Sequence, residues 1–409
     1  MDENRFLRGV AATSKIGKYE ISGFFSRKNI DATPAGNGTF STLQQSGLHR
    51  TPTEIAARKS LGLTSYGANI NRSYRQLNLG FTMATHQFSA EIQPQEQVFR
   101  LHQFRGTSQS QAAVDYQWIW RSMQFYGEGA INQNRGKAFV KGVFIPAAHN
   151  LTLNIHYRNH QPTYHALFNA PFGVSQNAGS GEKGAYIGFE WLQSANFTSN
   201  VYIDHYEFQW LRFRNAGPSR AKDYLWQGRY RINRKSSAYM RLRWQERDQN
   251  TNSEYPIRNQ DTERKLAWRS HLESEISPTW KIATRVEMSR HNWEDQTQYG
   301  WLVFQDLRFT HPSAPLTITG RYAIFDTDGF DSRIYAYEHD VLYGFSVPAY
   351  FNRGRRFYFV LKWQATKNCT FWLRFAQSTF HQTSSISSGL QEIAGNQLRD
   401  IRLQLRIKL

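Results

Sequence analysis

The end of the chain alternates between apolar and polar residues almost without exception. The apolar positions are Ile401, Leu403, Leu405, Ile407 and Leu409, and the polar positions between them are Arg402, Gln404, Arg406 and Lys408. Successive side chains of an extended strand point to opposite faces, so this segment has one apolar face and one charged face. A terminal strand of this kind is typical of a β-barrel whose outside meets lipid and whose inside meets water.

The same period of two runs along nearly the whole chain. Aromatic residues are 15% of the sequence while the mean hydropathy is −0.64, which fits strands that are apolar on alternate residues only. The sequence has no apolar run long enough for a transmembrane helix, whereas a membrane-spanning strand needs only about 9–11 residues. We therefore predict an all-β fold, a large antiparallel outer-membrane-type barrel of about 18–20 strands, and the sequence leaves its closure open.

Short connections alternate with long ones over much of the chain. Long loops are predicted at 29–61, 89–110, 159–183, 248–264 and 379–396. Tight turns on one rim and long loops on the other are typical of outer-membrane barrels, with periplasmic turns and extracellular loops. Inside the first loop, Thr51-Pro52-Thr53 predicts a short helix over 53–60. No linker is evident, so we interpret residues 1–409 as a single barrel domain.

The first residues lack the features of a signal peptide. The opening Met1-Asp-Glu-Asn-Arg-Phe-Leu-Arg8 has no basic region followed by an apolar stretch. An outer-membrane protein needs such a signal for export. Either the membrane interpretation is wrong or this chain begins downstream of the true start. We predict the bacterial outer membrane as its location, with the signal peptide lost by truncation.

The chain is strongly basic. Lysine and arginine total 50 against 32 acidic residues, a formal charge of +18. This balance favours anionic partners such as nucleic acid, lipopolysaccharide phosphates or acidic glycans, although a solvated polar face explains it as well. Cys369 is the only cysteine, which excludes a disulfide or a cysteine metal site within the chain.

Arginines concentrate on two predicted strands joined by the turn 233–235. The polar faces of these strands carry Arg229, Arg231, Arg241, Arg243 and Arg247, and further candidates for anion contacts in the lumen are Arg374 and Arg402. Neighbouring like charges are destabilising unless they are solvated or paired. Expected acid partners on the facing wall are Glu273, Glu287, Asp306, Glu338 and Asp340. Two interpretations stay open: a wall that binds or conducts anions, and a structural network of arginines and carboxylates.

Aromatic residues cluster near predicted strand ends, as in the girdles at lipid–water boundaries. One predicted strand, Tyr335–Phe345, places its aromatic rings on one face and Glu338 and Asp340 on the other. This partition favours lipid contact for the rings over the stacking of nucleic-acid bases.

Few residues suggest chemistry. Asp326–Asp331 is an acidic segment with a glycine that could offer oxygen ligands to calcium, but its spacing is not that of an EF-hand, and Asp and Gly favour turns in any case. In Glu338-His339-Asp340 the histidine of an extended strand points away from both acids. No nucleotide-binding, hydrolase or zinc-protease motif occurs. We therefore predict no enzyme, no catalytic residue, no metal and no cofactor.

Three segments resemble a known family. They are Phe40–Ile55, Ile324–Tyr343 with its continuation Ser346–Tyr350, and Ile386–Ile393. They are similar to the C-terminal barrel region of helix-hairpin-helix domain-containing proteins of Bacteroidota, and the resemblance covers essentially the whole chain. It implies that the signal peptide, the helix-hairpin-helix part and the earliest strands are absent here, with Leu7–Ala11 already inside the β region. The DNA-binding suggestion attached to that family does not carry over, because the motif that supports it is absent.

These observations predict an outer-membrane β-barrel that acts as a pore, a transport component or a surface scaffold with a basic polar lumen. The alternative is a nucleic-acid-binding barrel, for example one associated with DNA uptake. Expected partners are the lipid bilayer and lipopolysaccharide, with anionic ligands or DNA as candidates for the lumen and loops. A barrel enzyme would need a convergent Ser/His/acid set on one rim, which the sequence does not reveal.

Overall fold

A computed structural model describes residues 6–168, 171–174, 181–251, 259–381 and 383–408. In this part of the chain nearly all regular structure is β, and most of it belongs to one large antiparallel sheet, so the predicted fold class is confirmed. Leu409, the last apolar position of the terminal strand, lies outside the described residues.

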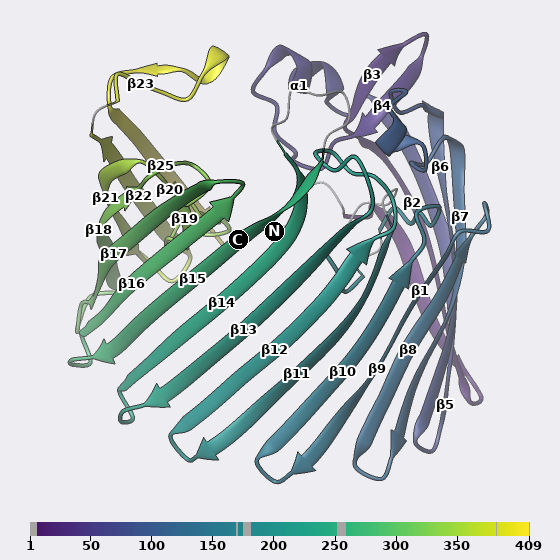
Figure 1. Ribbon diagram of the computed structural model, residues 1–409, viewed down its shortest axis with the longest axis horizontal. Coiled ribbons are helices and arrows are strands. Elements are labelled where there is room, and N and C mark those ends of the chain that lie inside the picture. The colour runs from purple at the N-terminus through teal and green to yellow at the C-terminus, as the bar shows by residue number, and fades with distance from the viewer. Residues whose placement is uncertain (1–5, 169–170, 175–180, 252–258, 382, 409) are drawn as a thin grey trace.

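The long strands follow one another as a meander, each paired antiparallel with the next (Figure 1). In the first half they are β1 (Gly9–Ile16), β2 (Tyr19–Ile30), β5 (Leu61–Tyr74), β6 (Leu77–Ile92), β7 (Gly106–Trp120), β8 (Met123–Asn132), β9 (Lys137–Ala148), β10 (Leu151–His160) and β11 (Glu182–Ser194). In the second half they are β12 (Phe197–Phe208), β13 (Ser219–Arg231), β14 (Ser236–Asn250), β15 (Gln260–Glu275), β16 (Trp280–Trp293), β17 (Gln296–Thr310), β18 (Leu316–Thr327), β21 (Arg353–Trp363), β22 (Cys369–Phe380) and β25 (Gln397–Ile407).

The described sheet has 21 strands, of which 19 form this meander, in agreement with the predicted count. The other two, β3 (Ala32–Gly36) and β4 (Thr39–Leu43), form a hairpin that joins the sheet where Phe40 bridges to Ile92 in parallel. The hairpin lies inside the first long loop, where the sequence predicted only a helix.

Connections lie on two rims, and every connection of seven or more residues lies on the same rim, which also carries the short links 133–136 and 294–295. The short-turn rim carries the links 17–18, 75–76, 121–122, 149–150, 195–196, 232–235, 276–279, 311–315 and 364–368. The long-loop rim carries 31–60, 93–105, 133–136, 161–181, 209–218, 251–259, 294–295, 328–352 and 381–396. The tightest turns need the left-handed backbone region, which Gly17 (φ 61°), Arg75 (φ 52°) and Arg121 (φ 55°) adopt.

The pleat of each strand separates an inward face from an outward face, where inward means the side that the curved sheet encloses. On β14 the outward side chains Met240, Leu242 and Trp244 are exposed, while Arg241 and Arg243 point inward. The terminal strand β25 repeats this division. Its apolar side chains Ile401, Leu403, Leu405 and Ile407 point outward, and Arg402 points inward beside Arg374. The alternation read from the sequence therefore gives the correct face for each of these residues.

The two edges of the meander, β1 and β25, have no ladder between them in the described residues. Figure 1 shows the sheet curving round from β1 on one side to β25 on the other. Outward apolar side chains on the edges are more exposed than those inside the meander, at 74% for Val10 and 64% for Ile401 against 39% for Leu242. Both edge strands run from the long-loop rim to the short-turn rim, because an antiparallel meander with an odd number of strands begins and ends in the same direction.

Residues 328–352 form an inward-folded segment, and the predicted strand Tyr335–Phe345 is wrong. The segment contains only the short pair β19 (Ile334–Tyr335) and β20 (Ala349–Tyr350), which Figure 1 places on the enclosed side of the sheet. Its buried side chains pack on inward apolar residues of β17, β18 and β22. This cluster is Leu302, Phe304, Ala323, Phe325, Ile334, Ala336, Tyr350, Phe380 and Ile386, with Leu398 against it. Residues 335–345 do alternate, but one face of the segment meets this cluster and the other meets the lumen. The aromatic rings of the segment therefore do not meet lipid.

Short elements complete the long loops. The helix α1 (Pro52–Ala57) begins at a Thr51 cap that forms a capping box with Glu54, close to the predicted range. The remaining elements are the 3₁₀ turns η1 (Val98–Arg100) and η2 (Gly389–Gln391) and the pair β23 (Ser385–Ile386) and β24 (Ile393–Ala394). No helix in the described ranges is long and apolar enough to cross a membrane.

Candidate functional site

Glu338 is the anchor of the inward-folded segment. Its carboxylate accepts hydrogen bonds from Arg356 of β21, at 2.6 Å and 2.8 Å, and from Arg374 of β22, at 2.6 Å. The Tyr350 hydroxyl donates to the same carboxylate at 2.8 Å. Glu338 and Arg374 have no exposed surface. A buried carboxylate must be paired to be tolerated, and here two guanidinium groups and a hydroxyl surround it.

Asp340 extends the network to the terminal strand. Arg402 of β25 donates to Asp340, and the Nε atom of Arg374 lies 3.7 Å from it. Arg374 and Arg402 also bind Asp400, at 3.0 Å and 2.8 Å. With Glu338 and Arg356, the network holds three carboxylates and three guanidinium groups, so its formal charges cancel. We call these six residues the lumen network.

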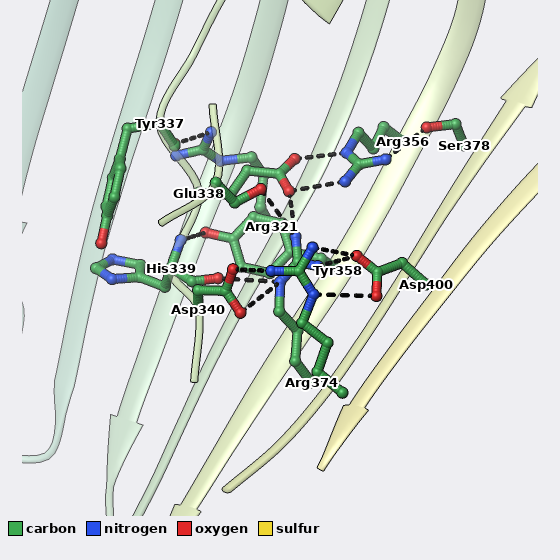
Figure 2. A network of polar contacts seen from close by, with 12 residues as sticks. Arg321, Tyr337, Glu338, His339, Asp340, Arg356, Tyr358, Arg374, Ser378 and Asp400 are labelled. Atoms are coloured by element: carbon green, nitrogen blue, oxygen red, sulfur yellow. Dashed lines mark hydrogen bonds and ion pairs between the residues drawn. The ribbon is translucent and has the colours of Figure 1, made fainter. Parts of the chain in front are cut away.

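A second contact holds the same segment from β18. The guanidinium of Arg321 forms two hydrogen bonds with Asp306, at 2.6 Å and 2.8 Å, and donates to the Tyr337 carbonyl at 2.7 Å. The Tyr358 hydroxyl of β21 accepts a hydrogen bond from the backbone N–H of His339 at 3.2 Å (Figure 2). The barrel wall therefore satisfies backbone groups of the segment as well as its charges, which fixes its position in the lumen.

The arginines of β13 and β14 lie in a more open environment. Arg243 pairs with Asp223, its Nε at 3.0 Å from Oδ1, and Arg241 donates to Gln227 at 2.9 Å and 2.6 Å. Arg231 donates to the Ala195 carbonyl at the short-turn rim at 2.8 Å. The exposed Arg229 has no hydrogen bond or ion pair in the described residues. We call these four arginines the arginine patch.

Of the predicted acid partners, Glu338 and Asp340 pair with Arg374 and Arg402. For the arginine patch the predicted pairing differs from the one observed. None of the predicted acids contacts the arginine patch in the described structure. Glu287 binds Arg269 of the neighbouring strand at 2.7 Å and 2.8 Å, while Glu273 is exposed and forms no ion pair in the described part. Partners come from adjacent strands of the same sheet, because cross-strand neighbours are much closer than the opposite wall.

Sequence reasoning missed a further buried network. Arg158 of β10 is fully buried and binds Glu182 at 2.6 Å and Asp204 of β12 at 2.8 Å and 3.1 Å. The guanidinium also lies over the rings of Phe172 and Tyr206. The alternation of β10 places Arg158 inward, but its acid partners lie 24 and 46 residues further along the chain, so no local pattern reveals them.

The sites described above consist of charged side chains held in fixed positions by hydrogen bonds and ion pairs. Within the described residues no group of His, Cys, Asp and Glu could hold a metal ion. In the segment Asp326–Asp331, Asp328 accepts the Tyr299 N–H at 2.8 Å, while Asp326 lies 3.7 Å from Arg353 and Asp331 lies 3.8 Å from Arg333. These contacts suit an acidic turn tied to the wall rather than a cation site.

Fold and inward charge together define a class: a large antiparallel sheet of outer-membrane-barrel type with a polar, arginine-rich interior. No protein-family model matches the chain, and no curated protein matches it. Among solved structures it is similar to the FrpB iron transporter from Neisseria meningitidis, at 10% identity over 97% of this chain and 78% of that one, with a TM-score of 0.40.

Two proteins of Pseudomonas aeruginosa are similar as well. FpvA bound to heterologous pyoverdines is 8% identical over 97% of this chain, with a TM-score of 0.47, and this chain covers 64% of it. OccK11 (OpdR) is 10% identical over 100% of both chains, with a TM-score of 0.37. At such identities and scores the likenesses assign neither ligand nor activity to this chain.

Proposed function

We propose that the chain forms the wall of an outer-membrane pore or transport component whose basic polar lumen is narrowed by the inward-folded segment. The observation that carries this proposal is the segment itself. Residues 328–352 leave the wall, enter the enclosed space and are held there by Glu338, Asp340 and Arg321. A surface scaffold has no need of a pinned segment inside its lumen, whereas a conducting barrel uses one to set the size and charge of its passage.

Placement in the outer membrane is part of the proposal. Exposed apolar side chains recur on the outward face of strand after strand, and extended apolar surface is typical of a membrane or partner contact. Inward faces carry the lumen network and the arginine patch, and the long loops lie on one rim. Fractionation of the full-length gene product, with heat-modifiable gel mobility, tests this placement. A soluble protein without a mobility shift would contradict it.

Ion conduction by the full-length gene product in planar lipid bilayers tests the function. We expect open-channel current with a preference for anions, because the arginine patch faces the lumen and, among the described residues, Asp223 is its one paired carboxylate. Replacing Arg241 and Arg243 by glutamine should shift the reversal potential in a KCl gradient toward cation preference. The matched control is Arg399→Gln, an arginine on the outward face of β25. Inserted protein without current would exclude a pore.

The relation to helix-hairpin-helix proteins and the nucleic-acid alternative stay predictions. A basic lumen that binds DNA phosphates should retain DNA at low salt and release it steeply as salt rises, because phosphate contacts release counterions. Absence of DNA retention at low salt would remove this alternative.

A further inference from the structure

We infer that the long-loop rim holds a binding site for a small solute that carries two or more anionic oxygen groups. The site is a cavity of about 620 Å³ beside the inward-folded segment. Four cationic side chains line it: Arg214, Arg247, Lys265 and Arg333. We call it the rim cavity. The role of this site in transport rests on the proposed function. Its ligand chemistry rests on the cavity alone.

Three separate parts of the chain build the rim cavity. Arg247 and Lys265 come from the long-loop ends of β14 and β15, Arg214 comes from the loop 209–218, and Arg333 comes from the inward-folded segment. Arg247 shares the inward face of β14 with Arg241 and Arg243. The cavity therefore lies at the mouth of the lumen, where a solute from the long-loop side meets the interior first.

Positive charge in the rim cavity exceeds negative charge. Four permanent cations face two carboxylates, Glu263 and Asp331. Glu263 is already engaged, since His291 lies 2.7 Å from it and Gln249 donates to it. Asp331 is exposed and lies 3.8 Å from Arg333. An anionic ligand would supply the missing counter-charge.

Several donors of the rim cavity lack acceptors in the described residues. The guanidinium of Arg247 has neither a hydrogen bond nor an ion pair there, although it faces inward and is half-buried. The Nε1 atom of Trp293, which also lines the cavity, is buried without an acceptor. A buried donor without a partner is costly, so these groups fit a ligand that brings acceptor oxygens.

The fixed contacts of the other cations keep the cavity in shape. Lys265 donates to the carbonyls of Asp331 and Arg333, at 3.3 Å and 3.4 Å, and so joins β15 to the inward-folded segment. Arg333 donates to the Tyr335 hydroxyl at 2.8 Å and to the Phe330 carbonyl at 2.6 Å. The cavity wall is therefore preorganised, which lowers the entropy lost when a ligand binds.

Size and shape select the ligand class. A cavity of this volume lies in the range that holds small molecules, and it exceeds the needs of a single orthophosphate. Four lining cations favour a solute with at least two anionic groups over one with a single charge. A cavity of this volume is too small for a nucleic-acid duplex.

Isothermal titration of the full chain, folded in detergent, with inorganic pyrophosphate tests the inference. We expect measurable binding to the wild type and at least tenfold weaker binding to Arg247→Gln. This substitution removes no hydrogen bond or ion pair of the described residues. The matched control is Arg399→Gln on the outward face of β25, outside the cavity, which should bind as the wild type does. Equal loss in both variants, orthophosphate bound as tightly as pyrophosphate, or no binding to folded protein would overturn the inference.

A chemical measurement on the wild type needs no variant to fold. Pyrophosphate should slow the reaction of Lys265 with acetic anhydride, measured by mass spectrometry, and leave Lys281 near the short-turn rim unaffected. Equal protection of both lysines, or of neither, would overturn the site. Bilayer recordings separate the two proposals: binding without current keeps the site and removes the pore, whereas current without binding keeps the pore and removes the site.

Discussion

The lumen network and the arginine patch use the same residue type on the same face of one sheet, in two different environments. In the lumen network Arg374 has no exposed surface and contacts three carboxylates, of which Glu338 is equally buried. In the arginine patch the side chain of Arg243 is 41% exposed and pairs with one carboxylate of the described part of the chain, Asp223. The inward-folded segment makes the difference, because it covers one wall and leaves the other open to water.

This contrast separates arginines with a structural role from arginines that remain available to mobile ions. Covered charges are balanced against each other and are strongly coupled, because little water screens them. Open charges are screened and weakly coupled, so they remain free to attract mobile ions. Substitutions in the two regions should therefore differ in kind: one set changes stability, and the other changes ion preference.

The largest effect is expected for Glu338→Gln. This change leaves Arg356 and Arg374 buried without their shared counter-charge, which should lower the free energy of unfolding by about 3–5 kcal/mol. Guanidinium unfolding of the detergent-folded protein measures it, and limited proteolysis should cut 328–352 faster. The exposed Glu273→Gln is the control and should stay near the wild type. Equal stability of the two variants would show that the lumen network does not hold the segment.

A smaller effect is expected for Tyr350→Phe. The variant keeps the ring in the buried cluster but loses the 2.8 Å hydrogen bond to Glu338. Bonds to charged groups are worth about 1.5–3 kcal/mol, so the unfolding midpoint should fall, and by less than in Glu338→Gln. A loss larger than that of Glu338→Gln would mean that ring packing, rather than charge, anchors the segment.

For Arg243→Gln the stability change should be only about 0.2–1 kcal/mol, because an exposed ion pair contributes little. Its effect should instead appear as reduced anion preference in bilayer recordings, and high salt should diminish the difference from the wild type. A large stability loss with unchanged selectivity would reverse the comparison between the two regions.

The smallest expected effect lies outside the lumen, at the helix α1. A hydrogen bond from the Arg50 side chain, together with backbone donors, lowers the pKa of Glu54 from 4.5 to about 2. A lowered pKa in the fold stabilises the helix above pH 4.5, and this contribution is lost as the pH falls toward 2. Hydrogen exchange of α1 amides, corrected for intrinsic rates, should therefore rise over that interval. Glu54→Gln should show no such step.

The sequence predicted the strands well because their information is local. Alternation alone assigned Arg241, Arg374 and Arg402 to the inward face, and the long loops predicted from sequence all lie on one rim. The inward-folded segment escaped prediction for the same reason. Ile334, Ala336 and Glu338 alternate as the residues of a spanning strand do. Only the long-range contacts of Glu338 with Arg356 and Arg374 show that the segment folds inward.

Ion partners were harder still to predict. Arg158 and Asp204 are 46 residues apart in sequence, and the rim cavity joins Arg214 with Arg333 from separate loops. A periodic pattern states which face a residue occupies. It contains no information about which loop folds back over that face.

The equal direction of β1 and β25 limits how copies of this chain could meet in a membrane. Copies inserted in the same orientation present edges that all run the same way, so any contact between two such edges brings parallel strands together. An antiparallel ladder at either edge requires a strand that runs from the short-turn rim to the long-loop rim. Contact between like edges would therefore be a parallel ladder, whose slanted hydrogen bonds are slightly less stable per residue than those of an antiparallel one.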